Sequence, residues 1–276
     1  MRILFIGDIF ARPGRTIVHE RLPELQKQYG VELTIANGEN AAGGFGITPQ
    51  IAEELFELGI DVITTGNHVW DKREIIDYMN SANGNETSLA RRVLRPANYP
   101  AGTPGFGWYQ GRTRSGVDYA VINVQGRVFM ASNDDPFRVV DELLQTITAK
   151  VVVVDLHAEA TSEKVALGWH LDGRVTAVLG THTHVPTADA QILPKGTGYQ
   201  TDAGMCGSFN SVIGMDTTIA VNRWTRKMPG EKLRPAEGPV TLCGVMVDID
   251  PSTGLCTRIQ PFRLGGRLSQ SLPEVA

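Results

Sequence analysis

The sequence predicts an α/β protein built on a parallel sheet that is covered on both faces. Over residues 2–80, short apolar runs alternate with segments of helical periodicity, an order typical of parallel strands joined by crossover helices. The valine run at 151–154 and the β-branched run at 175–179 indicate further strands that are buried on both faces. No linker and no fixed-period repeat interrupts the chain, so we expect one domain over residues 1–276, made of two wound halves, with a loose tail after about residue 264.

The first elements follow from apolar runs and from the residues that interrupt them. Residues 2–6, which are apolar after Arg2, predict a central strand. Residues 15–29 have an apolar side and predict a helix that Gly30 ends. Because Pro23 lies inside this segment, we expect a kink or two short helices. The next strand is predicted at residues 33–36.

A second helix and a third strand follow. Thr48 and Pro49 form a helix start, with a hydroxyl N-cap followed by proline at the first helical position. Residues 61–65 predict the third strand. We expect Asp71 to cap the helix that runs from there to about Asn80.

The alternation of strands and helices ends after residue 80, because residues 81–117 are rich in Gly, Pro, Asn and Arg. We expect an antiparallel excursion with a strand near 105–110 and a return strand at 119–124, whose edge could pair with a second subunit. The later elements are predicted in this order: a helix from Asp135-Pro136 to about 148, a helix at 161–171, strands at 191–193 and 198–202, a helix at 217–227, and a hairpin of 240–249 with 256–262.

Composition limits the classes of function. The chain has 276 residues, of which 42% are hydrophobic, enough for a large core. A net charge of −4 gives no sign of a surface that grips long nucleic acid, although a small phosphate ester could still bind. Three cysteines without a CxxC pair suggest a reducing cytoplasm. The apolar run at the N-terminus is too short for a signal peptide, and no stretch approaches a membrane span.

Polar side chains follow five of the predicted strands. The carboxyl ends of parallel strands form one edge of a sheet, where α/β proteins bind their ligands. Two histidines, His182 and His184, are two residues apart, so in extended backbone their side chains would point to the same place. The full set after the five strands is Asp8; Glu39 with Asn40; Asn67 with His68; His157; and His182 with His184.

This group predicts a metal site. Burying several carboxylates and imidazoles together requires cations between them. Oxygen ligands mixed with imidazole suit Mn, Fe or Zn better than Ca or Mg. About seven ligands are too many for one tetrahedral ion, which favours two metal ions, an arrangement suited to hydrolysis of a phosphate ester.

The motifs together resemble the calcineurin-like metallophosphoesterases. The residues that carry this resemblance are Gly7-Asp8, Gly38-Glu39-Asn40, Gly66-Asn67-His68, the single His157 and Gly180-Thr181-His182-Thr183-His184. Residues 37–40, 155–159, 181–185 and 201–205 also resemble the YmdB-like branch, the bacterial 2′,3′-cyclic-nucleotide 2′-phosphodiesterases. The sequence departs from the broad family where Phe10 replaces a histidine and where Glu39 replaces an aspartate.

The resemblance implies a fold, a cofactor and a reaction. The fold would be a sandwich of two mixed β-sheets flanked by helices. The cofactor would be two metal ions, Fe or Mn with Zn as an alternative, and a metal-bridging hydroxide would attack a small cyclic nucleotide to leave a 3′-nucleotide. His68 would give a proton to the leaving oxygen, and Gly43, Gly44 and Gly204 could let the substrate approach the backbone. One ion would be held by Asp8, Glu39, Asn40 and His184, and the second by Glu39, Asn67, His157 and His182.

Other interpretations fit the residues less well. The Gly43–Gly46 loop lacks the GxGxxG spacing of a dinucleotide fold and does not follow the first strand. An amidohydrolase barrel would have its His-x-His pair early in the chain. Cys206 has no evident histidine and acid partners to make it a nucleophile. A metal-binding signalling module with little turnover, or a phosphodiesterase for another diester, remains as an alternative.

Overall fold

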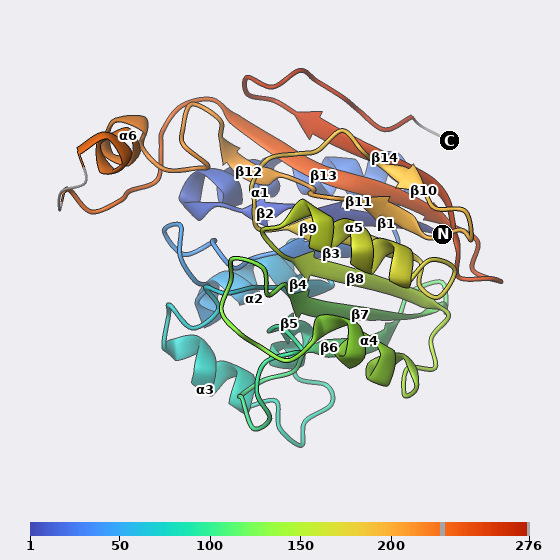
Figure 1. Cartoon of the computed structure of the whole chain (residues 1–276). Helices are drawn as coiled ribbons and strands as arrows, with labels where there is room; N and C mark the ends of the chain where they lie inside the picture. The colour runs from blue at the N-terminus through green and yellow to red at the C-terminus, as the bar shows by residue number, and fades with distance from the viewer. Residues whose placement is uncertain (227–229, 275–276) are drawn as a thin grey trace.

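The computed structural model describes residues 1–226 and 230–274 and consists of two β-sheets packed face to face (Figure 1). The first sheet has the strand order β2-β12-β13-β1-β3-β4-β5, with β14 added beside β13. The neighbours β1, β3, β4 and β5 are parallel, whereas β13 runs antiparallel to β1, so the sheet is mixed. Its strands are β1 (Arg2–Ile6), β2 (Asp8–Ile9), β3 (Leu33–Asn37), β4 (Val62–Thr64), β5 (Val93–Leu94), β12 (Met205–Ser208), β13 (Val240–Ile249) and β14 (Cys256–Leu264).

The second sheet has the order β10-β11-β9-β8-β7-β6. The four central strands are parallel, and the edge strands β6 and β10 pair antiparallel with their neighbours. This sheet is therefore mixed as well. Its strands are β6 (Trp108–Arg112), β7 (Asp118–Gln125), β8 (Val151–His157), β9 (Ala177–Thr181), β10 (Gln191–Ile192) and β11 (Gly198–Gln200).

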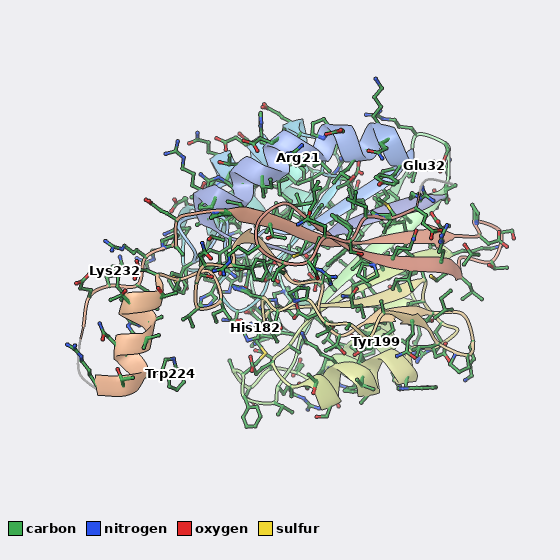
Figure 2. All side chains as sticks on the ribbon, turned by 90° about the horizontal axis from the view of Figure 1, so that it is seen from above. Arg21, Glu32, His182, Tyr199, Trp224 and Lys232 are labelled. Atoms are coloured by element: carbon green, nitrogen blue, oxygen red, sulfur yellow. The ribbon has the colours of Figure 1, made fainter. Side chains whose placement is uncertain are left out.

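Helices cover the outer faces of both sheets. The helices are α1 (Ala11–Tyr29), α2 (Pro49–Glu57), α3 (Glu74–Asn80), the 3-10 turn η1 (Leu89–Arg92), α4 (Pro136–Leu144), α5 (Thr161–His170) and α6 (Thr217–Arg226). Helices α1 to α3 share one apolar cluster with the first sheet, and α4 and α5 share another with the second sheet. Helix α6 stands apart from the sandwich (Figures 1 and 2).

A central core lies between the two sheets. Phe5 and Ile35 of the first sheet pack with Val121, Val153 and Leu179 of the second. All five side chains are fully buried. The order helix, sheet, sheet, helix confirms the predicted sandwich. It also corrects the simpler expectation from periodicity, because the inner face of each sheet is covered by the other sheet and not by helices.

Helix α1 differs from its prediction. It is one continuous helix that begins at Ala11, four residues before the expected start. Pro13 lies in the first turn, where a missing N–H costs nothing. Pro23 lies inside the helix, yet Leu22 and Leu25 beside it are buried against the sheet. Packing of this apolar side outweighs the hydrogen bond that Pro23 cannot make.

The predicted starts of α2 and α4 are confirmed, and the predicted cap of α3 is wrong. The Thr48 hydroxyl accepts a hydrogen bond from the Ile51 backbone N–H at 3.3 Å, which confirms the start of α2. Helix α4 starts at Asp135 and Pro136 as expected, with the Asp135 side chain as its N-cap, but it ends at Leu144 and not near 148. The expectation that Asp71 caps α3 is wrong, because the helix begins at Glu74 and the Asp71 carboxylate accepts from a histidine instead.

The C-terminal hairpin and α6 form as predicted, and Lys227 at the predicted end of that helix lies outside the described residues. Among the residues that the structure describes, no helix is both long and apolar enough to cross a membrane.

Candidate metal centre

The two sheets meet with the carboxyl ends of their central strands at one edge, and each sheet contributes part of the site. Asp8 begins β2 directly after β1, and the first sheet also supplies the residues that follow β3 and β4. The second sheet supplies His157, the last residue of β8, and the segment after β9 that contains His182, labelled in Figure 2. All seven residues predicted as metal ligands come together here, with His68 beside them: Asp8, Glu39, Asn40, Asn67, His157, His182 and His184.

The first group of candidate ligands surrounds His157. Its Nε2 lies 3.0 Å from Glu39 Oε1, 3.0 Å from Asn67 Oδ1 and 3.1 Å from His182 Nδ1. The ligand atoms of Glu39, His157 and His182 all lie within 4.8 Å of one another, close enough to share one metal ion.

The second group surrounds His184. Its Nε2 lies 3.1 Å from Asn40 Nδ2 and 3.7 Å from Asp8 Oδ1. Asn40 Nδ2 is also 3.0 Å from Glu39 Oε1, so Glu39 belongs to both groups. Asn40 could serve as a ligand after its amide turns over, which brings Oδ1 to the place where Nδ2 now lies. The buried Asp8 Oδ1 has no hydrogen-bond partner in the described structure.

Hydrogen bonds outside the two groups fix which nitrogen of two imidazoles carries the proton. The Thr181 hydroxyl donates to Asp155 at 2.7 Å, so its oxygen accepts from His157 Nδ1 at 2.9 Å. The Ile213 carbonyl accepts from His184 Nδ1 at 2.9 Å. The Glu159 carboxylate lies 3.2 Å from His182 Nε2. In their neutral forms, His157 and His184 therefore present the lone pair of Nε2 to the site.

These inward lone pairs and carboxylate oxygens repel one another unless a positive charge lies between them. His157 Nε2 lies within 3.1 Å of three other possible ligand atoms, from Glu39, Asn67 and His182. Together with the unpartnered Asp8 oxygen, this close grouping indicates that the residues fit a metal ion. An imidazole held by a carboxylate or carbonyl on its far side is the usual state of a metal-binding histidine.

The pKa directions indicate neutral imidazoles at His182 and His184 and a charged carboxylate at Glu39, whereas the pKa of His157 is raised, because the carboxylates of Glu39, Asp8 and Asp155 outweigh its burial. Burial lowers the pKa of His182 to about 3 and also lowers the pKa of His184. Burial alone would raise the pKa of Glu39, but the charge and hydrogen bond of His157 bring it down to about 2. Burial raises the pKa of Asp8 well above its usual range, and only a nearby cation would favour its charged form.

The backbone of the His182 and His184 segment is not extended, and the argument from strand alternation is wrong. Strand β9 ends at Thr181, and the φ angles of His182 and His184 are 95° and 66°. The turned backbone sends the two imidazoles to different groups and not to one point. Such φ angles are costly for residues with a side chain and persist only where neighbouring contacts hold them.

A buried ion pair between Lys164 and Asp202 holds the turn at residues 181–184, called the two-histidine turn below. Lys164 Nζ donates to the Thr181 carbonyl at 2.7 Å and to Asp202 Oδ2 at 2.8 Å. The same carboxylate oxygen accepts from the Thr183 backbone N–H at 3.1 Å, and its other oxygen accepts from the Gly204 N–H at 2.8 Å. The side chains of Lys164 and Asp202 are 0% exposed. The pair fixes both ends of the two-histidine turn.

His68 lies beside the two groups with part of its ring exposed. Its backbone N–H donates to Glu39 Oε2 at 3.2 Å, and its Nδ1 lies 2.9 Å from Asp71 Oδ2. Asp71 therefore orients His68 and leaves Nε2 free. Sequence reasoning missed Asp71 and Glu159 as parts of the site. Their signal was closeness in sequence to the predicted residues His68 and His157.

A cavity of about 440 Å³ opens over the site. Its lining combines polar residues, among them Glu39 and His68, with apolar residues next to them, such as Phe45 beside His68. The full lining is Phe10, Glu39, Asn40, Gly44, Phe45, His68, Glu159, His182, Thr183, His184, Val185, Ile213, Met215 and Leu233.

The three glycines predicted to contact substrate are placed differently from one another. Gly44 lines the cavity, and a side chain there would meet Phe10 and Met215 at 3.0 and 3.1 Å. Gly43 lies in the same loop with open space around it. Gly204 does not line the cavity, because it packs against Pro186.

Two residues discussed from sequence are buried. Phe10 packs edge-on against His184, with ring centroids 5.4 Å apart. Cys206 is fully buried, and burial raises the pKa of its thiol well above the usual value. A buried thiol in that state is a poor nucleophile.

The chain matches a known protein family and two curated proteins along most of its length. The family model described as "YmdB-like protein" matches residues 4–262. A 2′,3′-cyclic-nucleotide 2′-phosphodiesterase of Bacillus subtilis is 47% identical over 262 residues, covering 94% of this chain and 96% of that protein. A putative phosphatase/phosphodiesterase of Mycoplasma genitalium is 34% identical, covering 96% and 93%.

Two solved structures have the same fold as this chain. A hypothetical protein from Thermus thermophilus has a TM-score of 0.88 at 43% identity, over 97% of this chain and all of that one. A phosphatase from Mycoplasma pneumoniae has a TM-score of 0.87 at 32% identity, over 96% of this chain and 93% of that one.

Proposed function

The chain belongs to the YmdB-like family, and we propose that it is a metal-dependent phosphodiesterase that converts 2′,3′-cyclic nucleotides to 3′-nucleotides. The observation that carries the proposal is the grouping of three imidazoles around two buried carboxylates. The outer nitrogens of His157 and His184 bond to the Thr181 hydroxyl and the Ile213 carbonyl, so their inner nitrogens face Glu39 and Asp8, where a metal ion could bind.

We assign the ligands to two ions that share Glu39. Asp8, Glu39, Asn40 and His184 would hold one ion, and Glu39, Asn67, His157 and His182 would hold the other. The mixture of imidazole and oxygen ligands favours iron or manganese, with zinc as an alternative. Bound there, the ions would neutralise phosphoryl oxygens and lower the pKa of water at the site.

His68 would supply the proton that the leaving group needs. Cleavage of the bond between phosphorus and O2′ leaves a ribose alkoxide, and water adds to phosphorus to give the 3′-phosphate. The Asp71 carboxylate holds the ring through Nδ1, and a proton on Nε2 would pass to O2′. The ring faces the cavity, within reach of a bound phosphate ester.

His68 and Asp71 also separate this proposal from its main alternative. A metal-binding signalling module with little turnover would need no oriented acid at the cavity wall. The same machinery could serve another small phosphodiester, so the substrate itself must be tested.

The test removes metal with a chelator, restores Mn or Fe, adds 2′,3′-cyclic AMP and identifies the product by chromatography. We expect 3′-AMP from the metal-loaded protein and none from a His157→Ala variant. His170 lies on the surface beside Asp141, so a His170→Ala variant is the matched control and should retain activity. A 2′-monophosphate would reverse the leaving oxygen. Absence of turnover on this substrate and on an aryl phosphodiester would favour the binding module.

A further inference from the structure

The cavity has an apolar side that the chemistry described above does not use. Phe45, Met215 and Leu233 belong to one apolar cluster, and Val185 and Ile213 extend it along the cavity. Val185 and Ile213 are about half exposed, at 54% and 53%, which is high for large apolar residues next to a buried polar site. These five side chains, called the apolar wall below, offer no strong hydrogen-bond donor or acceptor.

The glycine-rich loop presents Phe45 to the cavity. Gly44 and Gly46 on either side have φ angles of 94° and 78°, which favour glycine. The Ala42 N–H donates to the Gly46 carbonyl at 2.8 Å, and the Gly44 N–H donates to the Asn40 carbonyl at 3.1 Å. The turn is thus tied to the backbone of Asn40 in the candidate metal centre, and Phe45 lies in this turn.

The apolar wall adjoins the proposed reaction centre at two points. The Phe45 ring meets the His68 ring edge-on, with centroids 5.0 Å apart. On the other side, Val185 follows His184 directly, and the Ile213 carbonyl accepts from His184 Nδ1. Ile213 has a φ of 45°, a strained conformation that aims its carbonyl at His184 and leaves its side chain in the cavity.

We propose that the apolar wall is a nucleobase subsite in which Phe45 stacks on the base of the substrate. This inference rests on the proposed function. A 2′,3′-cyclic nucleotide carries its base on the same ribose as the reacting phosphate, so a base must lie near the metal centre. The cavity volume of about 440 Å³ is in the range of sites for small molecules, about 300–1,000 Å³.

The chemistry of the wall suits a base better than a second phosphate or a sugar. Aromatic and aliphatic surfaces bind the flat face of any base, whereas charged or hydroxylated groups need polar partners. A wall without polar side chains cannot read the edge of the base. We therefore expect 2′,3′-cyclic AMP and 2′,3′-cyclic UMP to be used within about 10-fold of each other, with the larger purine preferred.

The test compares 2′,3′-cyclic AMP with methyl ribofuranoside 2′,3′-cyclic phosphate, which has a methyl group in place of the base. The measured quantity is the ratio of kcat/KM for the two substrates. We expect a ratio of at least about 10 for the unaltered protein, the size of one stacking contact. Phe45→Ala should lower the ratio about 10-fold, mostly through KM for 2′,3′-cyclic AMP.

Two variants serve as controls. Phe45→Tyr keeps the ring and should keep the ratio. Phe129 is 90% exposed and does not line the cavity, so Phe129→Ala should also keep it. A ratio near one in the unaltered protein would overturn the subsite while leaving the proposed function intact. Equal loss on both substrates in Phe45→Ala would overturn it too, because Phe45 would then act through His68. No turnover of either substrate would overturn the proposed function and the subsite with it.

Discussion

Replacing Lys164 with methionine tests whether the buried ion pair with Asp202 stabilises the protein and its two-histidine turn. Both side chains are 0% exposed, so the substitution leaves a carboxylate buried without its cation. Removing one partner of such a pair costs about 3–5 kcal/mol. Asp202 keeps its bonds from the N–H groups of Thr183 and Gly204, which places the expected loss in the free energy of unfolding near the lower end, about 3 kcal/mol.

The loss is measured by urea unfolding of the metal-free protein and by the melting temperature. A chain of this size shifts by roughly 2 °C per kcal/mol, so we expect a fall of about 6 °C. Lys150 is exposed and donates to the Ser252 carbonyl, so Lys150→Met is the matched control and should change stability by less than about 0.5 kcal/mol.

A double variant, Lys164→Met with Asp202→Asn, removes both charges at once. Because no unpaired charge stays buried, the free energy of unfolding should fall by less in the double variant than the sum of the falls in the two single variants. A loss below about 1 kcal/mol for Lys164→Met alone would refute the reasoning, because that is the value of a pair exposed to water.

The remaining predictions concern the proton donor, the metal and the thiols. Asp71→Asn should lower kcat about 10- to 100-fold while the metal content, measured by atomic emission, stays unchanged; unchanged turnover would show that His68 acts without this carboxylate. Adding Mn to the metal-free protein at 100 times its Kd should raise the free energy of unfolding by about 2.7 kcal/mol, seen as a higher melting temperature, and no shift would contradict the metal assignment. Burial raises the pKa of Cys243 and Cys256 to about 12 and raises that of Cys206 well above its usual range, so all three should stay protonated and unreactive toward a disulfide reagent at pH 8 until the chain is unfolded; fast labelling of the folded protein would be the contrary result.

The sequence allowed most of the longer strands and the polar residues that follow them to be predicted, because those depend on local patterns, whereas the short strands β2, β5 and β12 were missed. The valine run became β8, and all seven proposed ligands lie where the carboxyl ends of the strands meet. The pattern could not tell what covers each strand. A strand buried on both faces has the same composition whether a helix or a second sheet packs on it, so the sandwich followed only from the family resemblance.

Errors arose where a distant residue decides a local conformation. The turn that contains His182 and His184 depends on Asp202 and Lys164, which are far away in sequence. Local propensity does not predict this turn. Asp71 has the same chemistry whether it caps a helix or orients His68, so its role became clear only in three dimensions.

The division of the site between the two sheets has a consequence for how the protein matures. Asp8 and Glu39 come from the first sheet, His157 and His184 come from the second, and neither set alone offers a complete group of ligands. The first sheet in turn requires β13, which begins at Val240 and lies between β12 and β1. On the ribosome, the two sets of donors would therefore stay apart until β13 has emerged and the two sheets have packed together. Capture of metal by the proposed site would then follow the assembly of both sheets.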